Sequence, residues 1–489
     1  MSIASTPLTA SVTPSQVDQK KLKSRIVHIG FGAFHRAHQA LYTHDVLEKT
    51  AGDWGICVIS LFSGHELIKK LRAQQHRYLV AEKGAHKTIV KEIASVNESL
   101  HPMLDGKQAV IEKMAEQQVE IVSMTITEKG YCIDHTTGKL DENNPLIQND
   151  IATPSEPKSA IGYIVEALRL RRERGLQAFT VMSCDNVQEN GHNAQIAVLG
   201  LARLQDNELA QWIESHTTFP STMVDRIVPA VTPETLTEIT AMTGVDDPCA
   251  VACEPFRQWI IEDNFVQGRP DWNIAGAEFV QNVVPFEEMK LRMLNGSHSF
   301  LAYLGYLGGY QHISDTMANP CYQQATLDLM LKVQAVSLNM PVGTDLAGYA
   351  ELLIKRFSNP SLKHQTWQIA MDGSQKIPQR FVGSLLFHLQ HESDYKWLAM
   401  GIAGWMHYVG GVDEQGKIID VRDPLAQTFI DINDSHYNHP QRVKALLGID
   451  SIFDKALLAN DEFVETVTTA YQLIATHGAK QAVTSLSSL

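Results

Sequence analysis

The segment SRIVHIGFGAFHRAHQA, residues 24–40, decides the fold of the first half of this chain. Its apolar run at 25–29 leads directly into the G-F-G turn that contains Gly30 and Gly32, and a helical pattern follows. In this context the first glycine permits a tight turn, the second lets the backbone approach a pyrophosphate, and the start of the helix supplies N–H donors. The sequence therefore predicts a dinucleotide-binding loop whose contacts come from Gly30, Gly32, Ala33, Phe34 and Arg36.

Several features of this loop leave alternatives open. His35 replaces the third glycine of the usual pattern, so a purely structural turn is the alternative to a cofactor loop. His35 and His38 also have the spacing of a metal-binding pair, although packing or hydrogen bonding is the expected role. The second strand normally ends in an acid that holds the ribose of NAD, and here only Ser63 or Glu66 is near its end. NAD is the expected cofactor, and the residues alone leave NADP open.

The composition limits the kinds of partner. With 489 residues and 44% hydrophobic content, the chain can bury sizeable cores and is expected to form two or three domains. Its formal charge of -14, from 55 acidic and 41 basic residues, disfavours nucleic acid and anionic membrane surfaces as partners. A small anionic substrate would require a local cluster of basic side chains or backbone N–H groups. The sequence predicts no particular oligomeric state.

The remaining composition features predict a cytoplasmic protein. Residues 1–23 are rich in serine and threonine, lack the apolar core of a signal peptide and are expected to form a flexible arm. The longest apolar stretch, residues 300–310, is shorter than the about 20 residues that span a bilayer. The cysteines show no C-x-x-C pairing and are expected to be reduced thiols. Cys249 and Cys253 are candidate metal ligands, but no further ligand follows at a suitable spacing, so no metal site is expected.

The order of predicted elements divides the chain into two domains after the arm. Short β-rich runs alternate with helical patterns through the first half, which indicates an α/β domain with a largely parallel sheet. The predicted strands lie at residues 25–29, 56–62, 77–81, 119–125 and 179–184, and a helix is expected at 160–174. Helical patterns dominate from residue 286 onward. We therefore expect a Rossmann-like dinucleotide-binding domain at 24–285 and a mainly α-helical domain at 286–489.

A second informative segment, FEEMKLRMLNGSH at residues 286–298, contains a K-x4-N-x2-H pattern. On an α-helix its acid, amine, amide and imidazole would fall within an arc of roughly 140°. An ordinary solvated helix face is the alternative, but the following turns are apolar, and a buried polar face needs partners or a chemical role. When a hydride moves between an alcohol and a ketone, a desolvated lysine can exchange the hydroxyl proton. Amide and imidazole groups can stabilise the alkoxide.

The longer segment KLRMLNGSHSFLAYLGY, residues 290–306, resembles the signature of the mannitol dehydrogenase family of metal-independent polyol dehydrogenases. Similar segments occur through about residues 24–485, among them ITEKGYC at 126–132, FTVMSCDN at 179–186 and TMVDRIVPA at 222–230. The resemblance implies an N-terminal Rossmann-like domain and a C-terminal helical domain that together enclose the active site. This implied architecture agrees with the domain boundary predicted from the element order.

The resemblance also implies roles for the matching residues. It makes Lys290 the general acid/base and Asn186 and Asn295 the donors of an oxyanion pocket, and Asn186 is also expected to contact the cofactor. It makes His298 the group that orients the reacting oxygen, and Glu287 the carboxylate that controls proton exchange with solvent. The segment that carries Thr127 and Glu128 resembles the loop beside the nicotinamide, and Asp225 matches an active-site acid that is expected to contact substrate.

Within the family, TWQIAMDGSQKIPQR at residues 366–380 resembles the branch that acts on hexuronates rather than on polyols. Lys376 and Arg380 then become candidates for holding the carboxylate of a sugar acid, and the alternative for them is an ordinary basic surface turn. The resemblance implies reversible NAD-dependent reduction of a hexuronate ketone, with a polyol or another uronate as the alternative substrate. A non-catalytic NAD-binding regulator is a further alternative, which the complete set of Lys290, Asn295 and His298 disfavours.

Overall fold

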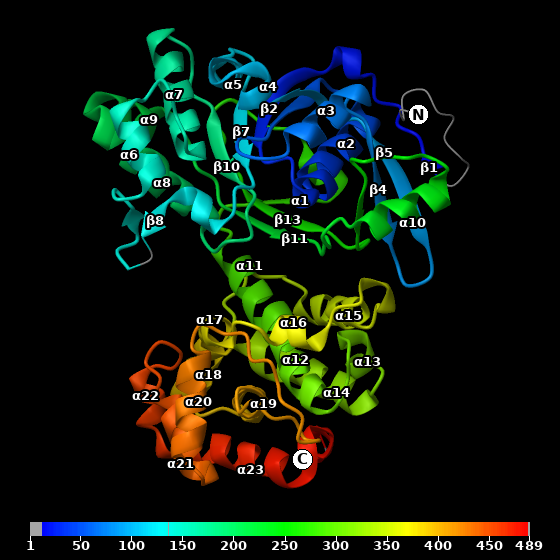
Figure 1. The fold of residues 1–489 in the computed structure, drawn as a ribbon, viewed down its shortest axis with the longest axis vertical. Helices are drawn as coiled ribbons and strands as arrows, with labels where there is room; N and C mark the ends of the chain where they lie inside the picture. The colour runs from blue at the N-terminus through cyan, green and yellow to red at the C-terminus, as the bar shows by residue number, and fades with distance from the viewer. Residues whose placement is uncertain (1–11, 135, 488–489) are drawn as a thin grey trace. The chain divides into compact units, whose positions relative to one another are not determined.

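The computed structural model describes residues 12–134 and 136–487 and divides into two compact units, Met1–Val284 and Pro285–Leu489. Figure 1 shows sheets with covering helices in the first unit and helices in the second. The boundary expected from the sequence lay between residues 285 and 286. The first unit holds the predicted dinucleotide loop, and the second holds the K-x4-N-x2-H segment.

The first unit is built on a five-stranded parallel sheet with the strand order β10-β7-β2-β3-β6. Its strands are β2 (Lys23–Ile29), β3 (Trp54–Ile59), β6 (Val96–Leu100), β7 (Ile121–Met124) and β10 (Thr180–Ser183). Every residue of β7 and β10 is buried, as is typical of parallel strands that are covered on both faces. The α/β class predicted from the alternating pattern is confirmed.

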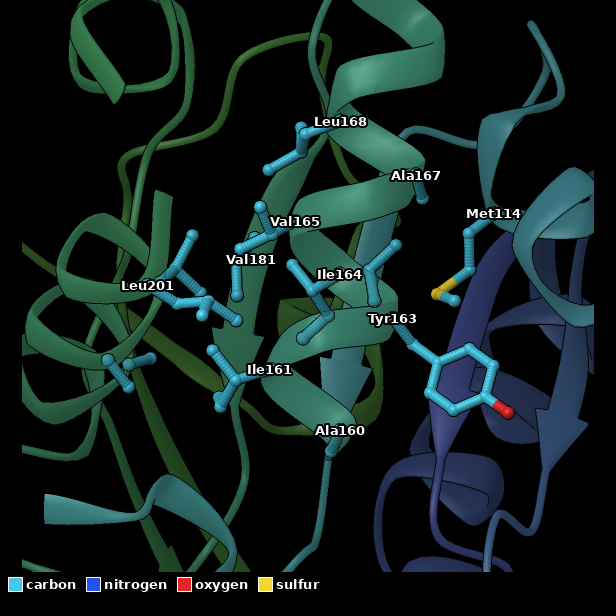
Figure 2. Packing of buried hydrophobic residues seen from close by; sticks show 14 of the residues in the cluster. Met114, Ala160, Ile161, Tyr163, Ile164, Val165, Ala167, Leu168, Val181 and Leu201 are labelled. Carbon is cyan, nitrogen blue, oxygen red and sulfur yellow. The ribbon is translucent and has the colours of Figure 1, made fainter. Parts of the chain in front are cut away.

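Helices follow most of these strands. Those of the first unit are α1 (Ala33–Ala37), α2 (Gln39–Thr50), α3 (His65–Ala73), α4 (Pro102–Asp105), α5 (Lys107–Ala115), α6 (Pro145–Ala152), α7 (Ala160–Glu173), α8 (Asn190–Gln205), α9 (Asn207–His216) and α10 (Pro233–Thr243). Figure 2 shows α7 in a core cluster of the first unit, with Val165 beside Val181 of β10 and with Met114 of α5 on its other side. This apolar packing fixes α5, α7 and α8 against the central sheet.

A second sheet corrects two expectations. The strand predicted at 77–81 is β4 (Tyr78–Lys83), and it lies in a separate sheet with β1 (Val12–Thr13), β5 (Thr88–Ile93) and β12 (Val251–Cys253). The predicted flexible arm is wrong for residues 12–23, because Val12 pairs with Val90 and both Val12 and Val17 are buried. Residues 1–11 of that arm lie outside the described residues. β4 and β5 run antiparallel, so the parallel order is confined to the central sheet and a few other pairs.

Smaller elements complete the first unit. A third sheet has the order β11-β13-β14, with β11 (Thr222–Asp225), β13 (Gln258–Glu262) and β14 (Glu278–Val280), and a ribbon joins β8 (Ile133–Asp134) to β9 (Lys139–Leu140). Short 3-10 turns occur at η2 (Gln19–Lys21), η3 (Glu128–Tyr131) and η4 (Trp272–Ala275). Of these, η3 adjoins the predicted nicotinamide loop.

The regular elements named for the second unit are helices, which loops and two isolated β-bridges connect. Its α-helices are α11 (Val284–Met289), α12 (Ser297–Leu307), α13 (Ile313–Met317), α14 (Pro320–Asp328), α15 (Leu346–Phe357), α16 (Thr366–Ala370), α17 (Gly373–Ile377), α18 (Gly383–Gln390), α19 (Lys396–Tyr408), α20 (Ala426–Ser435), α21 (His439–Leu447), α22 (Lys455–Leu458) and α23 (Asp461–Ser487). Three π-helical segments, η5 (Lys290–Gly296), η6 (Leu329–Gln334) and η9 (Pro378–Val382), and two 3-10 turns, η7 (Ala335–Ser337) and η8 (Pro360–Leu362), interrupt them. The apolar helix α19 packs against α12 and α23 in the core. Within the described residues, no helix combines the length and apolar character needed to cross a membrane.

Candidate functional site

Gly30 forms the turn at the carboxyl end of β2. Its φ is +114°, a conformation that residues with side chains rarely adopt, and its N–H donates to the carbonyl of Ile59 at 2.7 Å. A Cβ at this position would lie 2.4 Å from the carbonyl oxygen of Thr125, just beyond β7. The backbone conformation and the available space therefore both require glycine.

Gly32 lies beside a pocket of about 580 Å³ in the first unit. The pocket is lined by Gly32, Ala33, Phe34, Thr125, Thr127, Glu128, Cys184, Asp185, Asn186 and Val187. An added Cβ on Gly32 would meet no atom within 4 Å, so packing gives no reason for glycine here, whereas the close approach of a ligand does. The pocket adjoins the carboxyl ends of β7 and β10, where open parallel sheets bind nucleotides. Its geometry fits a dinucleotide, and six of the predicted cofactor residues line it.

Replacing Gly32 by alanine is expected to leave the fold intact and to weaken cofactor binding. The new methyl group has free space in the protein, so the melting temperature should not change. It would occupy the volume that a pyrophosphate is expected to approach, so the Kd for NAD should rise by about 10-fold or more, or about 1.4 kcal/mol. Calorimetric titration measures this Kd, and Gly30→Ala, which should lower the melting temperature, is the control. Unchanged NAD affinity in Gly32→Ala would show that this loop does not contact the cofactor.

Asp185, to which the sequence assigned no role, fixes the loop beside this pocket. Its carboxylate accepts hydrogen bonds from the N–H groups of Ile126 at 3.0 Å and Thr127 at 2.9 Å, and from the Tyr131 hydroxyl at 2.7 Å. Thr127 has a φ of +63°, which is rare for a β-branched residue and which these bonds maintain. Burial raises the pKa of Asp185, although its three donors favour the ionised form. Its position directly after a buried strand is the sequence signal that could have identified it.

Arg36, a predicted cofactor contact, is not among the residues that line this pocket. Its side chain is buried, and Nη1 donates to the carbonyl of Cys249 at 2.6 Å while Nε donates to the carbonyl of Gly32 at 3.3 Å. Burial lowers the pKa of Arg36. We therefore assign Arg36 to bracing the glycine loop from inside the protein.

Three buried histidines lie beneath the loop. The ring of His35 stacks on that of His28, with centroids 3.6 Å apart, so His35 fills the helix–strand contact that the third glycine usually makes. His28 bonds to the hydroxyl of Ser123 at 2.8 Å, and Nε2 of His38 donates to the carbonyl of Gln258 at 3.1 Å. The described residues contain no group of three or more His, Cys, Asp or Glu side chains placed to hold a metal ion.

These histidines are expected to make the stability of the protein fall in mild acid. Burial lowers the pKa of His28 and of His38 to about 3. It lowers the pKa of His35 well below its usual value, and the charge of His28 lowers the pKa of His35 further. Because the folded pKa values lie below the unfolded value of about 6.5, the stabilisation is present above that pH and is lost as the pH falls below it. Each histidine adds up to about 1.4 kcal/mol per pH unit to the slope of the free energy of unfolding against pH. Urea unfolding between pH 8 and 5 measures this slope. A slope in His35→Phe as steep as in wild type would contradict the contribution assigned to His35.

In the second unit, the K-x4-N-x2-H segment is not one regular α-helix. It begins in α11, passes through the π-helix η5 and continues into α12, so the regular α-helix on which the arc of roughly 140° was calculated does not run through its middle. A π-turn closes at the fifth residue, one later than an α-turn. Lys290 and Asn295 are five residues apart. On an α-helix they would be separated by about 140°, whereas the π-turn brings them to the same side.

The motif side chains are largely removed from solvent. Glu287 is 5% exposed and Lys290 is 7% exposed. His298 stacks on the ring of Phe357 at a centroid distance of 5.0 Å, and its Nε2 has no hydrogen-bond partner among the described residues. Burial lowers the pKa of His298 well below its usual value, and nearby positive charges lower it further. A neutral imidazole with an unused ring nitrogen is suited to holding a substrate oxygen.

Four basic side chains, here called the basic group, surround this imidazole in the second unit. They are Arg356, His364, Lys376 and Arg380, and the charge of each lowers the pKa of His298. The sequence predicted Lys376 and Arg380 but missed the other two members. The loop before α16 carries His364 and the end of α15 carries Arg356, so no local spacing connects them with the motif.

Lys376 and Arg380 form no ion pair in the part of the chain that the structure describes. Nζ of Lys376 donates to the main-chain carbonyls of Ile369 at 3.1 Å and Met371 at 2.5 Å. Burial, with the charge of Arg380, lowers the pKa of Lys376 to about 8, although the carboxylates of Asp372 and Asp423 oppose this shift. Burial also lowers the pKa of Arg380 to about 10. Partly buried positive charge without a bonded carboxylate favours a bound anion.

The other two residues predicted from the resemblance lie in the first unit. Asn186 follows β10 and lines the pocket beside Gly32. Asp225 is the last residue of β11 and is 6% exposed. The first unit therefore carries the cofactor loop, Asn186 and Asp225, and the second carries Lys290, Asn295, His298 and the basic group.

A dinucleotide pocket on a parallel sheet, together with a buried lysine and a partly buried amide and imidazole on one helical segment, defines an oxidoreductase that acts on a secondary alcohol group. Residues 24–274 match the mannitol dehydrogenase Rossmann domain, and residues 282–475 match the mannitol dehydrogenase C-terminal domain. The chain therefore belongs to the mannitol dehydrogenase family.

Individual relatives agree with this membership. The chain is 62% identical to D-mannonate oxidoreductase of Escherichia coli (strain K12), with 96% of this chain and 97% of that protein covered. Its fold is similar to that of Pseudomonas fluorescens mannitol 2-dehydrogenase in complex with NAD and D-mannitol, at 37% identity and a TM-score of 0.81, covering 98% and 97% of the two chains. It is also similar to D-sorbitol dehydrogenase, at 34% identity and a TM-score of 0.90, covering 97% and 98%.

Proposed function

We propose that this protein interconverts D-mannonate and D-fructuronate, with NAD as the hydride carrier. The observation that carries the choice of an acidic sugar is the basic group, in which the partly buried Lys376 and Arg380 have no ion pair in the described part of the chain. The high identity to D-mannonate oxidoreductase supports the same substrate. A polyol carries no charge that would compensate these cations. The cytoplasm, expected from the composition, is the proposed location.

The residues of the first unit are proposed to bind and position the cofactor. Gly30 and Gly32 shape the loop for the pyrophosphate, and Thr127 and Glu128 contact the nicotinamide side. When bound, the nicotinamide ring supplies or accepts the hydride. Asp185 keeps the loop in place through its bonds to two backbone N–H groups. These residues exclude water from one side of the reacting carbon and leave the proton to other groups.

The residues of the second unit are proposed to handle the proton and the oxygen. In the oxidation direction Nζ of Lys290, as a neutral amine, takes the hydroxyl proton, and in the reduction direction it returns that proton to the oxygen. The amide of Asn295 and the imidazole of His298 donate to the oxygen as negative charge develops on it, and Asn186 is proposed as a third donor. Glu287 is proposed to pass the proton between Lys290 and water. Lys376 and Arg380 hold the carboxylate, and Asp225 is proposed to contact a substrate hydroxyl.

The reaction is tested by following NADH oxidation with purified, chelator-treated protein. D-fructuronate, tagaturonate, fructose and NADPH are compared under the same conditions. Turnover on D-fructuronate with NADH at the highest kcat/KM is the expected result. Activity on fructose or tagaturonate without activity on D-fructuronate would contradict the proposed substrate, and NADH binding without turnover on any of them would favour a regulatory protein.

A further inference from the structure

The π-turn η5 is contacted by side chains from two other π-helical segments. η5 packs against η6 and η9. Nη1 of Arg380, in η9, donates to the main-chain carbonyl of Asn295 at 3.2 Å and to the hydroxyl of Ser299 at 2.8 Å. Gln334, the last residue of η6, is fully buried, and its Oε1 accepts a hydrogen bond from the hydroxyl of Ser297 at 3.1 Å. The two neighbours therefore hold the end of the π-turn on both of its flanks.

Gly296 allows this close approach. A Cβ on Gly296 would lie 2.4 Å from Nε2 of Gln334 and 3.1 Å from the carbonyl oxygen of Arg380. Glycine destabilises the interior of a helix. Its presence at position 296, with Gln334 and Arg380 packed against it, indicates that this close packing outweighs the lower helix propensity of glycine. The Gln334 amide consequently lies directly against the backbone of the turn that contains Asn295.

We propose that Gln334 is a positioning residue that holds η5 in its π form and thereby places Lys290 and Asn295 on the same side of the helix. The K-x4-N spacing equals the five-residue span of a π-turn hydrogen bond, so the two groups stay together only while the turn is kept. In an α-helical form, the amide would turn away from the amine by about 140°. This inference rests on the proposed function, because it concerns the same lysine and amide.

Gln334 accepts its hydrogen bond from Ser297 and lies against Gly296, so its effect passes through the backbone of η5. Loss of the π-turn should separate the proton-transfer group from the oxygen donor. A lower kcat with little change in KM is then expected, because the donor is required most strongly in the transition state. The pH dependence of kcat should also move, because the surroundings of Lys290 change with the turn.

The experiment compares Gln334→Leu, Gly296→Ala and the double variant with the control Gly305→Ala. Gly305 lies later in α12, and a Cβ there would lie 2.5 Å from Oγ1 of Thr316, so the control is equally crowded without touching η5. Kinetic constants, the pH profile of kcat, the melting temperature and NAD affinity are measured for each. Gln334→Met, with an unbranched side chain, carries the same prediction and replaces Gln334→Leu if that variant does not fold.

The two single variants are expected to lower kcat about 10- to 100-fold, with KM within about threefold of wild type and a shifted pH profile. The double variant should be no worse than the poorer single variant, because both changes break one contact. Gly305→Ala should have a lower melting temperature than wild type, with an unchanged kcat and an unchanged pH profile of kcat. An unchanged kcat and pH profile in Gln334→Leu, or losses that only parallel those of Gly305→Ala, would overturn the proposal.

The assay uses whichever alcohol the wild-type protein oxidises best. If D-mannonate is not a substrate but another polyol is, the proposed function fails while the comparison of variants still tests Gln334. If D-mannonate is oxidised and the Gln334 variants behave like wild type, the function stands and the positioning role fails.

Discussion

Lys290→Ala is expected to lower kcat by about 10²- to 10⁴-fold in both directions, the loss typical of removing a general acid/base. Alanine cannot take the hydroxyl proton, and no other amine replaces Lys290 within the motif. NAD affinity should not change, because the residues proposed to hold the cofactor belong to the first unit. Steady-state kinetics with D-mannonate, together with NAD titration, measure both quantities.

Lys290→Arg distinguishes the proton-transfer role of Lys290 from the role of its positive charge. Arginine stays protonated throughout the accessible pH range and cannot act as a general base, so this variant should be as inactive as alanine. Added small primary amines should restore part of the activity of Lys290→Ala and none of that of Lys290→Arg. The exposed Lys444 in α21 provides the matched control, and Lys444→Ala should be fully active. Near-normal turnover in Lys290→Ala would remove this residue from the mechanism.

Lys376→Met is expected to raise the KM for D-mannonate by about 10- to 100-fold, because a hydrogen bond to a charged group contributes about 1.5–3 kcal/mol. Methionine keeps most of the length of the side chain and removes its charge. D-mannitol has the same carbon chain without a carboxylate, so any activity on it should not change. The ratio of kcat/KM for the two substrates is the measurement, and Lys355→Met, at an exposed position of α15, is the control.

The pH dependence provides an independent check of this role. The pKa of Lys376 is lowered to about 8, so the ammonium form that attracts a carboxylate is present below that pH and is lost above it. The KM for D-mannonate should therefore rise as the pH passes about 8 in wild type, and this rise should be absent in Lys376→Met. An equal loss of activity on D-mannonate and D-mannitol would instead indicate that Lys376 only supports the structure around Ile369 and Met371.

The structure changes the interpretation of several predicted residues. Arg36 belongs to the same glycine-rich segment as Gly32, yet its guanidinium is turned into the protein, because the carbonyl of Cys249 accepts its hydrogen bond there. Residues 12–23 were expected to be an arm because the segment is poor in apolar residues. β1 nevertheless pairs with β5 at the edge of a sheet, since main-chain hydrogen bonds do not require apolar side chains. Both differences arise from partners that lie far away in the sequence.

Local patterns were sufficient for the features that depend on neighbouring residues. The strand, the Gly30 turn and the adjacent helix follow from the local sequence, because backbone sterics and hydrophobic periodicity act over a few residues. The α/β class and the K-x4-N-x2-H set could be read from the sequence in the same way. Three features depend on tertiary packing: η5 is π-helical, Asp185 holds Thr127, and Arg356 and His364 join Lys376 and Arg380. The hydrogen-bond pattern of a helical turn and the surroundings of a charged side chain both depend on side chains from distant segments of the sequence. These segments meet only when the chain has folded.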